Sequence, residues 1–347
     1  MNQKKSKLKT PALIVIPVLI LIVFSLSINF SGKTENSLIV YCSHDSVFAD
    51  KILSKFTEET GIKIIPKYDT EASKSLGLTE KILFDKENTE CDVYWSNEIL
   101  SMPALKDAGL LLPYKGSGYE RIPQKYKDPE AYWCGFAARL RVVIYNKNLF
   151  KGSFKDIQSE METEELNSVA IALPLYGTTL THFAALWKNS GPEKLKAQFK
   201  SWKSRGVQLV AGNGPSRNLV ANGTCKFGWT DTDDYFGAVD KKQPVAMFPC
   251  RLADGSTICI PNTVGIIKYT KKEQLAKKFA DFLLSERIEW ELANSSSRQI
   301  PLGKVSRELS SEVKELMSFA EEGCDLREVF SIRDALINWI KEAENLK

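Results

Sequence analysis

The chain has 347 residues, of which 43% are hydrophobic and 26% charged, a balance typical of globular proteins. The formal net charge is +4, but four positive charges lie before residue 10: Lys4, Lys5, Lys7 and Lys9. The rest of the chain is therefore close to neutral, and no basic stripe with interleaved aromatic residues occurs, which argues against nucleic acid as a partner. The length is sufficient for two domains and a sizeable core.

Residues 1–32 are predicted to be separate from the folded part. A lysine-rich start precedes "PALIVIPVLILIVFSLSINF" at 11–30, a run without charge. A basic flank before an apolar core is the plan of a secretory signal peptide, and the run is also nearly long enough to be a membrane anchor. Both alternatives place residues 33–347 outside the cytoplasm, in the periplasm or on the outer face of the cytoplasmic membrane.

From residue 37 onward, strand and helix patterns alternate. "SLIVYC" at 37–42 is a β-branched run, and 46–61 has apolar residues at helical spacing with Gly61 as its stop. Strand-like runs follow at 62–68 and 91–95, with helical patterns between and after them. Such alternation predicts an α/β fold with a mostly parallel sheet covered by helices.

The second half of the chain begins with a longer extended run, "FAARLRVVIYN" at 136–146, after which alternation resumes. Without a repeat or a low-complexity linker, we expect two α/β lobes joined by extended strands. The expected division is 37–141 for the first part of lobe 1, 142–249 for lobe 2, and 250–347 for a return to lobe 1 plus C-terminal helices.

Polar residues cluster where the predicted strands end, the place where ligands bind in such folds. A single cluster can equally be a helix cap, since Ser, Thr, Asp and Asn are the preferred N-cap residues. Five clusters at strand ends in both halves predict a cleft between facing surfaces. The candidate ligand-binding residues are Ser43, His44, Asp45, Glu71, Ser73, Asn97, Gly177, Thr178, Thr179, Asp231, Asp233 and Asp234.

The stretch "WTDTDDYFGAV" at 229–239 concentrates three carboxylates in four positions, which repel one another unless something compensates them. A metal, a cationic ligand, a general base or a helix cap could each explain the cluster. Gly177, Thr178 and Thr179 instead lie where a strand leads into a helix, a place whose free N–H groups favour an anion.

Seven cysteines in an exported protein suggest disulfides, although an odd number cannot all pair within one chain. "MFPCRLADGSTICIPN" reads as two short strands around Asp254-Gly255, a favoured hairpin turn. Pairing outward from that turn places Cys250 opposite Cys259, within disulfide reach. The alternative is a pair of buried free thiols.

Signatures of an enzyme are weak. No G-x-S-x-G elbow, phosphate-binding G-x-x-x-x-G-K-[ST] loop or zinc-spaced cysteine pair occurs in the sequence. A hydrolase that uses the acidic cluster with Cys42 or His44 remains a third possibility, but we expect no enzymatic activity and no catalytic cofactor.

Several phrases in order, from about residue 37 to 303, carry a family resemblance: "LIVYCSHDSVFADKILSKFTEETGIKI", "CDVYWSNEI", "ALKDAGLLLPY", "GFAARLRVVIYN", "IALPLYGTTLTH", "FGWTDTDD", "IPNTVGIIK" and "SSSRQIPL". Together they resemble an extracellular solute-binding protein of a bacterial ABC importer, in the branch usually described as ferric-iron binding. The resemblance implies a two-lobed, periplasmic-binding-protein-like (type II) fold with a ligand cleft, and an ABC permease and ATPase as partners.

In ferric-binding relatives a His or Glu from the first lobe and a Tyr-Tyr pair from the second hold the metal, often with a bound anion. Here Asp233 and Asp234 stand where the tyrosines fall, and His44 lies one position from the expected histidine, whose place Asp45 takes. Carboxylates are hard donors that suit Fe³⁺. Asp233, Asp234 and His44 are thus the expected metal ligands.

We therefore predict a monomeric binding protein that captures ferric iron, or an iron complex with a synergistic anion such as citrate or carbonate. The alternative is a binder of a small organic anion or zwitterion without metal, such as a phosphonate, a sugar phosphate or a thiamine-like molecule.

Overall fold

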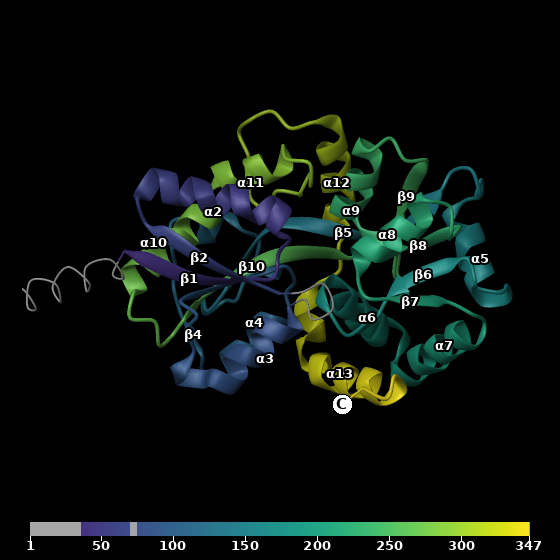
Figure 1. Ribbon diagram of the computed structural model, residues 1–347, viewed down its shortest axis with the longest axis horizontal. Helices are drawn as coiled ribbons and strands as arrows, with labels where there is room; N and C mark the ends of the chain where they lie inside the picture. Colours follow the sequence, from purple (N-terminus) through teal and green to yellow (C-terminus); the bar gives the residue numbers. More distant parts are fainter. Residues whose placement is uncertain (1–35, 70–74, 347) are drawn as a thin grey trace, which may run out of the picture.

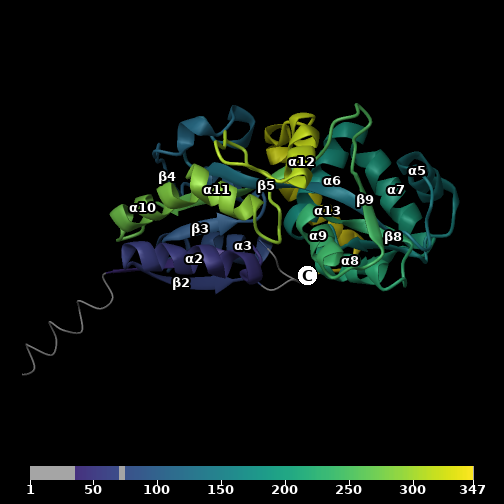
Figure 2. The same ribbon diagram turned by 90° about the horizontal axis from the view of Figure 1, so that it is seen from above.

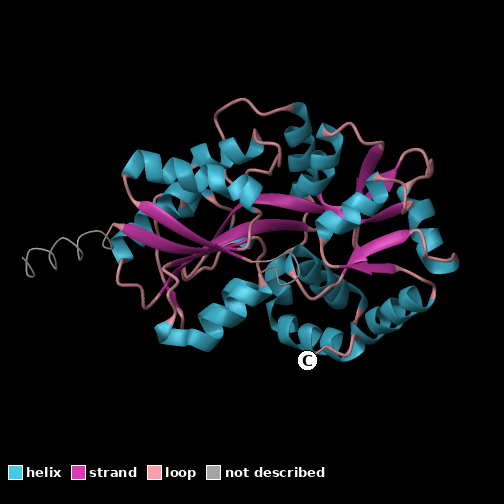
Figure 3. Cartoon of the chain, viewed as in Figure 1, coloured by secondary structure: helices cyan, strands magenta, loops and turns pink. Residues whose placement is uncertain are grey.

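The computed structural model describes residues 36–69 and 75–346, so that residues 1–32, Glu71 and Ser73 lie outside the described part. The chain forms two α/β lobes side by side, which confirms the predicted fold class (Figures 1, 2 and 3). Within the described ranges, no helix combines the length and the apolar character needed to cross a membrane.

The strands form one ten-stranded sheet in the order β2-β1-β3-β10-β5-β8-β6-β7, with β4 added on β10 and β9 on β5. Strands β1, β2 and β3 are parallel, and β10 runs antiparallel to β3. The strands are β1 Ser37–Cys42, β2 Lys63–Tyr68, β3 Val93–Ser96, β4 Leu111–Leu112, β5 Cys134–Asn146, β6 Val169–Ala172, β7 Gln208–Val210, β8 Phe227–Asp231, β9 Val245–Pro249 and β10 Cys259–Ile267.

Strand β5 connects the lobes, as its unusual length predicted. Its first half pairs with β10 in lobe 1, and its second half pairs with β8 and β9 in lobe 2. The register of β5 with β10 shifts between Pro261 and Asn262, opposite Ala138 and Phe136 in the lobe 1 half of β5.

Helices cover both faces of the sheet. In lobe 1, α2, α10 and α11 lie on one side of the strands and α3 and α4 on the other (Figure 1). The α-helices are α2 Ser46–Thr60, α3 Leu76–Asp85, α4 Ser101–Asp107, α5 Phe154–Thr163, α6 Gly177–Ser190, α7 Pro192–Ser204, α8 Asn213–Ala221, α9 Thr232–Asp240, α10 Glu273–Leu283, α11 Glu286–Ala293, α12 Ser311–Glu321 and α13 Arg333–Ala343. Short 3₁₀ helices are η1 Lys86–Asn88, η2 Tyr119–Arg121, η3 Gln124–Tyr126 and η4 Leu326–Ile332.

The end of α2 follows its sequence. Four apolar residues at helical spacing are buried, and the helix ends at Gly61, whose φ of 69° is in the left-handed region. The Gly61 N–H closes the helix on the Thr57 carbonyl at 2.9 Å.

The C-terminal helix α13 contacts both lobes. Its Trp339 ring packs against Trp187 of α6 and Phe199 of α7, with centroids 5.7 and 5.6 Å away. At the start of the same helix, the Arg333 guanidinium pairs with Glu80 of α3 at 2.9 Å. The segment therefore ties lobe 2 to lobe 1, and the expected lobe boundaries stay predictions.

The predicted disulfide is not formed, because Cys250 and Cys259 are both buried free thiols. Between β9 and β10, which both pair with β5, the chain does turn back on itself, but Arg251 lies opposite Thr257, one residue away from the predicted register. Cys250 packs in the core on the α3, α4 and α6 side of the sheet, and Cys259 packs on the α2 and α10 side. The two side chains thus point to opposite faces.

Candidate functional site

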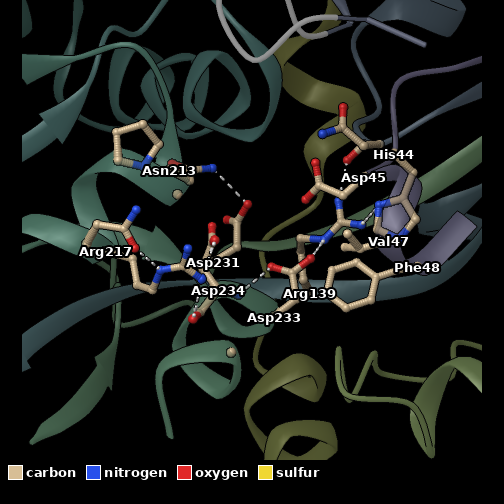
Figure 4. A pocket seen from close by; sticks show the side chains of 15 residues that line it. His44, Asp45, Val47, Phe48, Arg139, Asn213, Arg217, Asp231, Asp233 and Asp234 are labelled. Carbon is tan, nitrogen blue, oxygen red and sulfur yellow. Dashed lines mark hydrogen bonds and ion pairs between the residues drawn. The ribbon is translucent and has the colours of Figure 1, made fainter. Parts of the chain in front are cut away.

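A cavity of about 320 Å³ lies where the two lobes meet. Lobe 1 contributes the start of α2, Asn97 and Arg139, and lobe 2 contributes the starts of α8 and α9 (Figure 4). Its lining residues are His44, Asp45, Val47, Phe48, Asn97, Arg139, Asn213, Gly214, Pro215, Arg217, Asn218, Asp231, Asp233, Asp234 and Gly237.

The three aspartates of lobe 2 reach the cavity because β8 ends at Asp231 and α9 begins at Thr232. One carboxylate oxygen from each of Asp231, Asp233 and Asp234 lies within 4.8 Å of the others. The positive end of the α9 dipole favours negative charge at this point. The predicted acidic cluster thus forms one spatial group in the interlobe cavity.

Asp231 is bound by a largely buried network. It accepts hydrogen bonds from Arg141 at 2.7 Å, from Thr178 at 2.5 Å and from Asn213 at 2.9 Å. Arg141 is 0% exposed and also donates from Nε to His182 Nδ1 at 3.4 Å. Its Nη2 has no hydrogen-bond partner within the described chain. The main electrostatic role of Asp231 is therefore to balance the charge of the buried Arg141 guanidinium.

Asp233 faces Arg139, which links the lobes. The Arg139 Nε lies 3.1 Å from Asp233 Oδ2, a charge contact without the alignment of a hydrogen bond. The two Nη atoms donate to the Asn97 carbonyl at 2.6 Å and to Asn262 Oδ1 at 2.9 Å. Because Arg139 is 1% exposed and fixed at both Nη atoms, its guanidinium is a stationary positive charge in the pocket.

His44 is enclosed rather than open to a ligand. Its Nδ1 lies 3.2 Å from Arg139 Nη2, and its Nε2 lies 2.8 Å from the Gln299 amide nitrogen. The ring packs against Phe48 and Trp95, with centroids 5.6 Å away in both cases. In this arrangement protein groups occupy both ring nitrogens, so His44 can ligate a metal only after Arg139 or Gln299 moves.

Asp234 is the least compensated of the three carboxylates. It accepts a hydrogen bond from Thr230 at 2.9 Å, and its only ion pair in the described chain is with Arg217, at 3.4 Å. Burial, and then the neighbouring Asp233 carboxylate, raises the pKa of Asp234 to about 8, against the lowering effect of Arg217. This carboxyl group therefore holds a proton that a cation could replace.

Gly177, Thr178 and Thr179 are at the start of α6, as expected. The two threonine hydroxyls, however, donate hydrogen bonds to other groups of the protein. Thr178 donates to Asp231, and Thr179 donates to Asn213 Oδ1 at 3.0 Å. The space beside them is only about 20 Å³, room for one water molecule. This small cavity shares Asn97 and Asn213 with the interlobe pocket, and Asn97 Oδ1 is buried there without a hydrogen-bond partner in the described chain.

The structure thus brings six predicted residues together around one pocket: His44, Asp45, Asn97, Asp231, Asp233 and Asp234. Ser43 lies apart from the lining and contacts Asp69 and Tyr94, at 3.3 and 3.0 Å. The sequence reasoning missed three arginines: Arg139, Arg141 and Arg217. Two of them were visible as charges two positions apart in the otherwise apolar run 136–146, a spacing that puts both on one face of a strand.

Two α/β lobes with a polar pocket between them are the architecture of periplasmic binding proteins. The chain belongs to the family of bacterial extracellular solute-binding proteins, whose family model matches residues 43–289. Among curated proteins it is similar to iron uptake protein A1 of Synechocystis, with 23% identity over 276 residues, 76% of this chain and 75% of that protein.

Solved structures with the same fold share about one residue in five with this chain. Apo ferric ion-binding protein A of Pasteurella haemolytica superposes with a TM-score of 0.76, at 21% identity over 89% of this chain and 98% of that one. Trichodesmium IdiA (FutA) in complex with iron and citrate gives 0.67, at 19% identity over 90% and 100%. AfuA of Actinobacillus pleuropneumoniae with fructose-6-phosphate gives 0.73, at 20% identity over 88% and 98%.

Proposed function

We propose that this protein is the extracytoplasmic solute-binding component of an ABC importer, and that its cargo is iron(III) together with an oxyanion such as citrate. One observation carries the proposal: three carboxylates that line the pocket lie within ligand distance of one another, and each is paired with an arginine. Names of relatives that refer to iron support the metal, and the iron- and citrate-bound IdiA (FutA) supports the pairing with an anion.

The charges explain why an anion accompanies the metal in this proposal. Carboxylate oxygens are hard donors suited to Fe³⁺. A bare trivalent ion, however, would lie beside the fixed guanidinium of Arg139, only 3.1 Å from Asp233. Asp231, Asp233 and Asp234 each face an arginine, so a cargo with both a cationic and an anionic part can pair with both kinds of group.

In this scheme, binding of the cargo gives Asp234 and Arg217 new partners. Iron replaces the proton and the Arg217 contact of Asp234, and Arg217 then turns to the oxyanion. Arg217 is suited to this role because its contact with Asp234 is the longest of the three ion pairs, at 3.4 Å. Arg139 and Arg141, which are both buried, stay in place and contribute positive charge toward the anion.

We infer that closure of the lobes over the cargo produces the form that a membrane permease recognises. Residues 1–32 would then direct the chain out of the cytoplasm, as a cleaved signal or as an anchor. The protein would act as a monomer that binds its cargo without chemical turnover.

A second candidate is a metal-free organic phosphate or zwitterion. It is favoured by the pairing of each of the three carboxylates with an arginine and by apolar walls at Val47, Phe48 and Pro215. The volume of about 320 Å³ is at the lower end for small-molecule pockets. The similarity to AfuA with fructose-6-phosphate is in line with this candidate.

Isothermal titration calorimetry of the purified protein separates the candidates. Ferric citrate, citrate alone and fructose 6-phosphate are titrated in turn, the last with a strong iron chelator present. Tight binding of ferric citrate that is lost in Asp233→Ala plus Asp234→Ala supports the first candidate. Tight binding of the sugar phosphate in the presence of chelator supports the second. Consumption of any ligand without partner subunits would contradict both.

A further inference from the structure

A second contact between the lobes lies outside the pocket, at the C-terminal end of α9. The Arg298 guanidinium binds both carboxylate oxygens of Asp240, at 3.0 and 2.8 Å. The same guanidinium lies over the Phe236 ring, 4.6 Å from its centroid. A bidentate ion pair and a cation–π contact thus converge on one side chain.

The partners belong to different lobes. Asp240 and Phe236 are on α9, which packs against α8, β8 and β9 of lobe 2 and against the shared strand β5, while the Phe236 side chain reaches the cluster that contains the lobe 1 core. Arg298 follows α11, which contacts α10 and β5, and its loop joins β5 through the pair formed by Ala138 and Ile300. Its φ of 44° is in the left-handed region, which is unusual for a side chain of this size.

Both ends of this contact lead directly to the pocket. Helix α9 carries Asp233 and Asp234 in its first turn and Asp240 as its last residue, so one rigid element of nine residues joins cargo ligands and ion pair. On the other side, Gln299 follows Arg298 and contacts His44 Nε2 at 2.8 Å. The Arg298 contact is therefore connected to both walls of the pocket.

We propose that Arg298, with Asp240 and Phe236, is an interlobe clasp that sets the ratio of closed to open protein and so controls how fast cargo leaves. The inference rests on the proposed function, since it assumes a cargo held between the lobes. Within the described chain, Arg298 is connected to the pocket only indirectly, through α9 and through Gln299. It is therefore a positioning residue.

The expected effect is moderate because the ion pair is partly exposed, at 21% for Arg298 and 39% for Asp240. A partly exposed ion pair and a cation–π contact together correspond to about a fivefold change in the ratio of closed to open protein. Cargo release should accelerate by about the same factor, and high salt should weaken the effect.

The protein offers a matched control within one lobe. Arg287 forms a similar bidentate pair with Glu59, at 2.5 and 2.7 Å, and its guanidinium also lies over a ring, that of Phe282. The Arg287 side chain is 35% exposed, against 21% for Arg298. Arg287→Ala should therefore have a similar cost in local stability without changing lobe closure.

The first experiment needs no cargo. Small-angle X-ray scattering compares wild type, Arg298→Ala, Asp240→Ala and Arg287→Ala, with circular dichroism to establish that each variant is folded. We expect a larger radius of gyration for the first two variants only, with recovery in the reversed pair Arg298→Asp plus Asp240→Arg. Equal radii for all four proteins, or equal expansion in Arg287→Ala, would overturn the clasp.

The second experiment measures the rate of ferric citrate release by stopped-flow tryptophan fluorescence. About fivefold faster release in Arg298→Ala, with the wild-type rate in Arg287→Ala, is the expected result, and equal rates in the two variants would count against the clasp. If wild type fails to bind ferric citrate, the proposed cargo is wrong, while the scattering comparison still decides the clasp.

Discussion

Substitution of Asp234 by Asn should stabilise the cargo-free protein and impair binding of a cation. Asp234 accepts a hydrogen bond from Thr230 at 2.9 Å, an interaction that an amide oxygen can keep. The substitution gives up the Arg217 ion pair, whose length of 3.4 Å makes it a modest loss. In return it removes a carboxylate that burial and Asp233 disfavour.

The size of the effect follows from the raised pKa of Asp234, about 8 against an ordinary value of 3.8. Each pKa unit corresponds to about 1.4 kcal/mol, so the shift is an upper limit of roughly 4 kcal/mol at pH 7. After the loss of the Arg217 contact we expect a net increase of about 1–3 kcal/mol in the free energy of unfolding.

The sign of the pH dependence is fixed by the same shift. Because the folded protein binds this proton more tightly than the unfolded chain does, the Asp234 contribution to the free energy of unfolding falls as pH rises from about 4 to about 8. The gain from Asp234→Asn should therefore be negligible near pH 4 and largest above pH 8.

Urea unfolding followed by fluorescence, at pH 4.5, 7 and 8.5, measures this gain in the cargo-free protein. Calorimetry with ferric citrate then measures binding by the same preparations. A variant that is less stable than wild type at pH 8.5 would show that Asp234 is a structural cap. Unchanged affinity for ferric citrate would show that Asp234 does not hold the cation.

Three further predictions concern the buried groups. Asp231→Ala leaves the buried Arg141 without its counter-charge and should lower the free energy of unfolding by about 3–5 kcal/mol in urea titrations, whereas Asp107→Ala at an exposed position should change it by less than about 0.5 kcal/mol. Burial, and then Arg141, lowers the pKa of His182 well below 6.5, so below pH 6.5 this group should reduce stability by up to about 1.4 kcal/mol per pH unit. His182→Gln should show a flatter stability curve from pH 5 to 6.5, and an unchanged slope would contradict the burial of a neutral imidazole. Cys250 and Cys259 should both be alkylated after unfolding without reductant, as mapped by mass spectrometry, and protection of the pair would restore the expected disulfide.

The fold could be predicted because local patterns and global topology agree in this chain. Alternating strand and helix signals gave the α/β class, and the long run at 136–146 marked the strand that links the lobes. The acidic cluster was found in the same way, since a strand that ends at Asp231 before a helix must present its polar residues at the edge of the sheet.

The partners of the cluster were not predicted, because they come from other elements. Arg141 meets Asp231 through the antiparallel register of β5 and β8, and Arg217 comes from α8. Charges so close together imply compensating charges nearby, and that requirement is the signal that could have pointed to Arg139 and Arg141.

The predicted register of the hairpin around Asp254-Gly255 was wrong, and with it the predicted disulfide. The turn forms, with the Gly255 N–H donating to the Leu252 carbonyl at 3.0 Å, but Arg251 pairs with Thr257 and the register is shifted by one residue. A shift of one residue turns the side chains of one strand to the other face, so the two cysteines face different cores.

The central claim is that the interlobe pocket takes a cation and an anion together. Equilibrium dialysis of the purified protein against iron-55 and carbon-14 citrate, each label alone and both combined, tests it most directly. The account predicts that the two labels bind in fixed proportion, and that neither binds tightly without the other. Tight binding of iron in the absence of any oxyanion, or of citrate in the absence of iron, would contradict it.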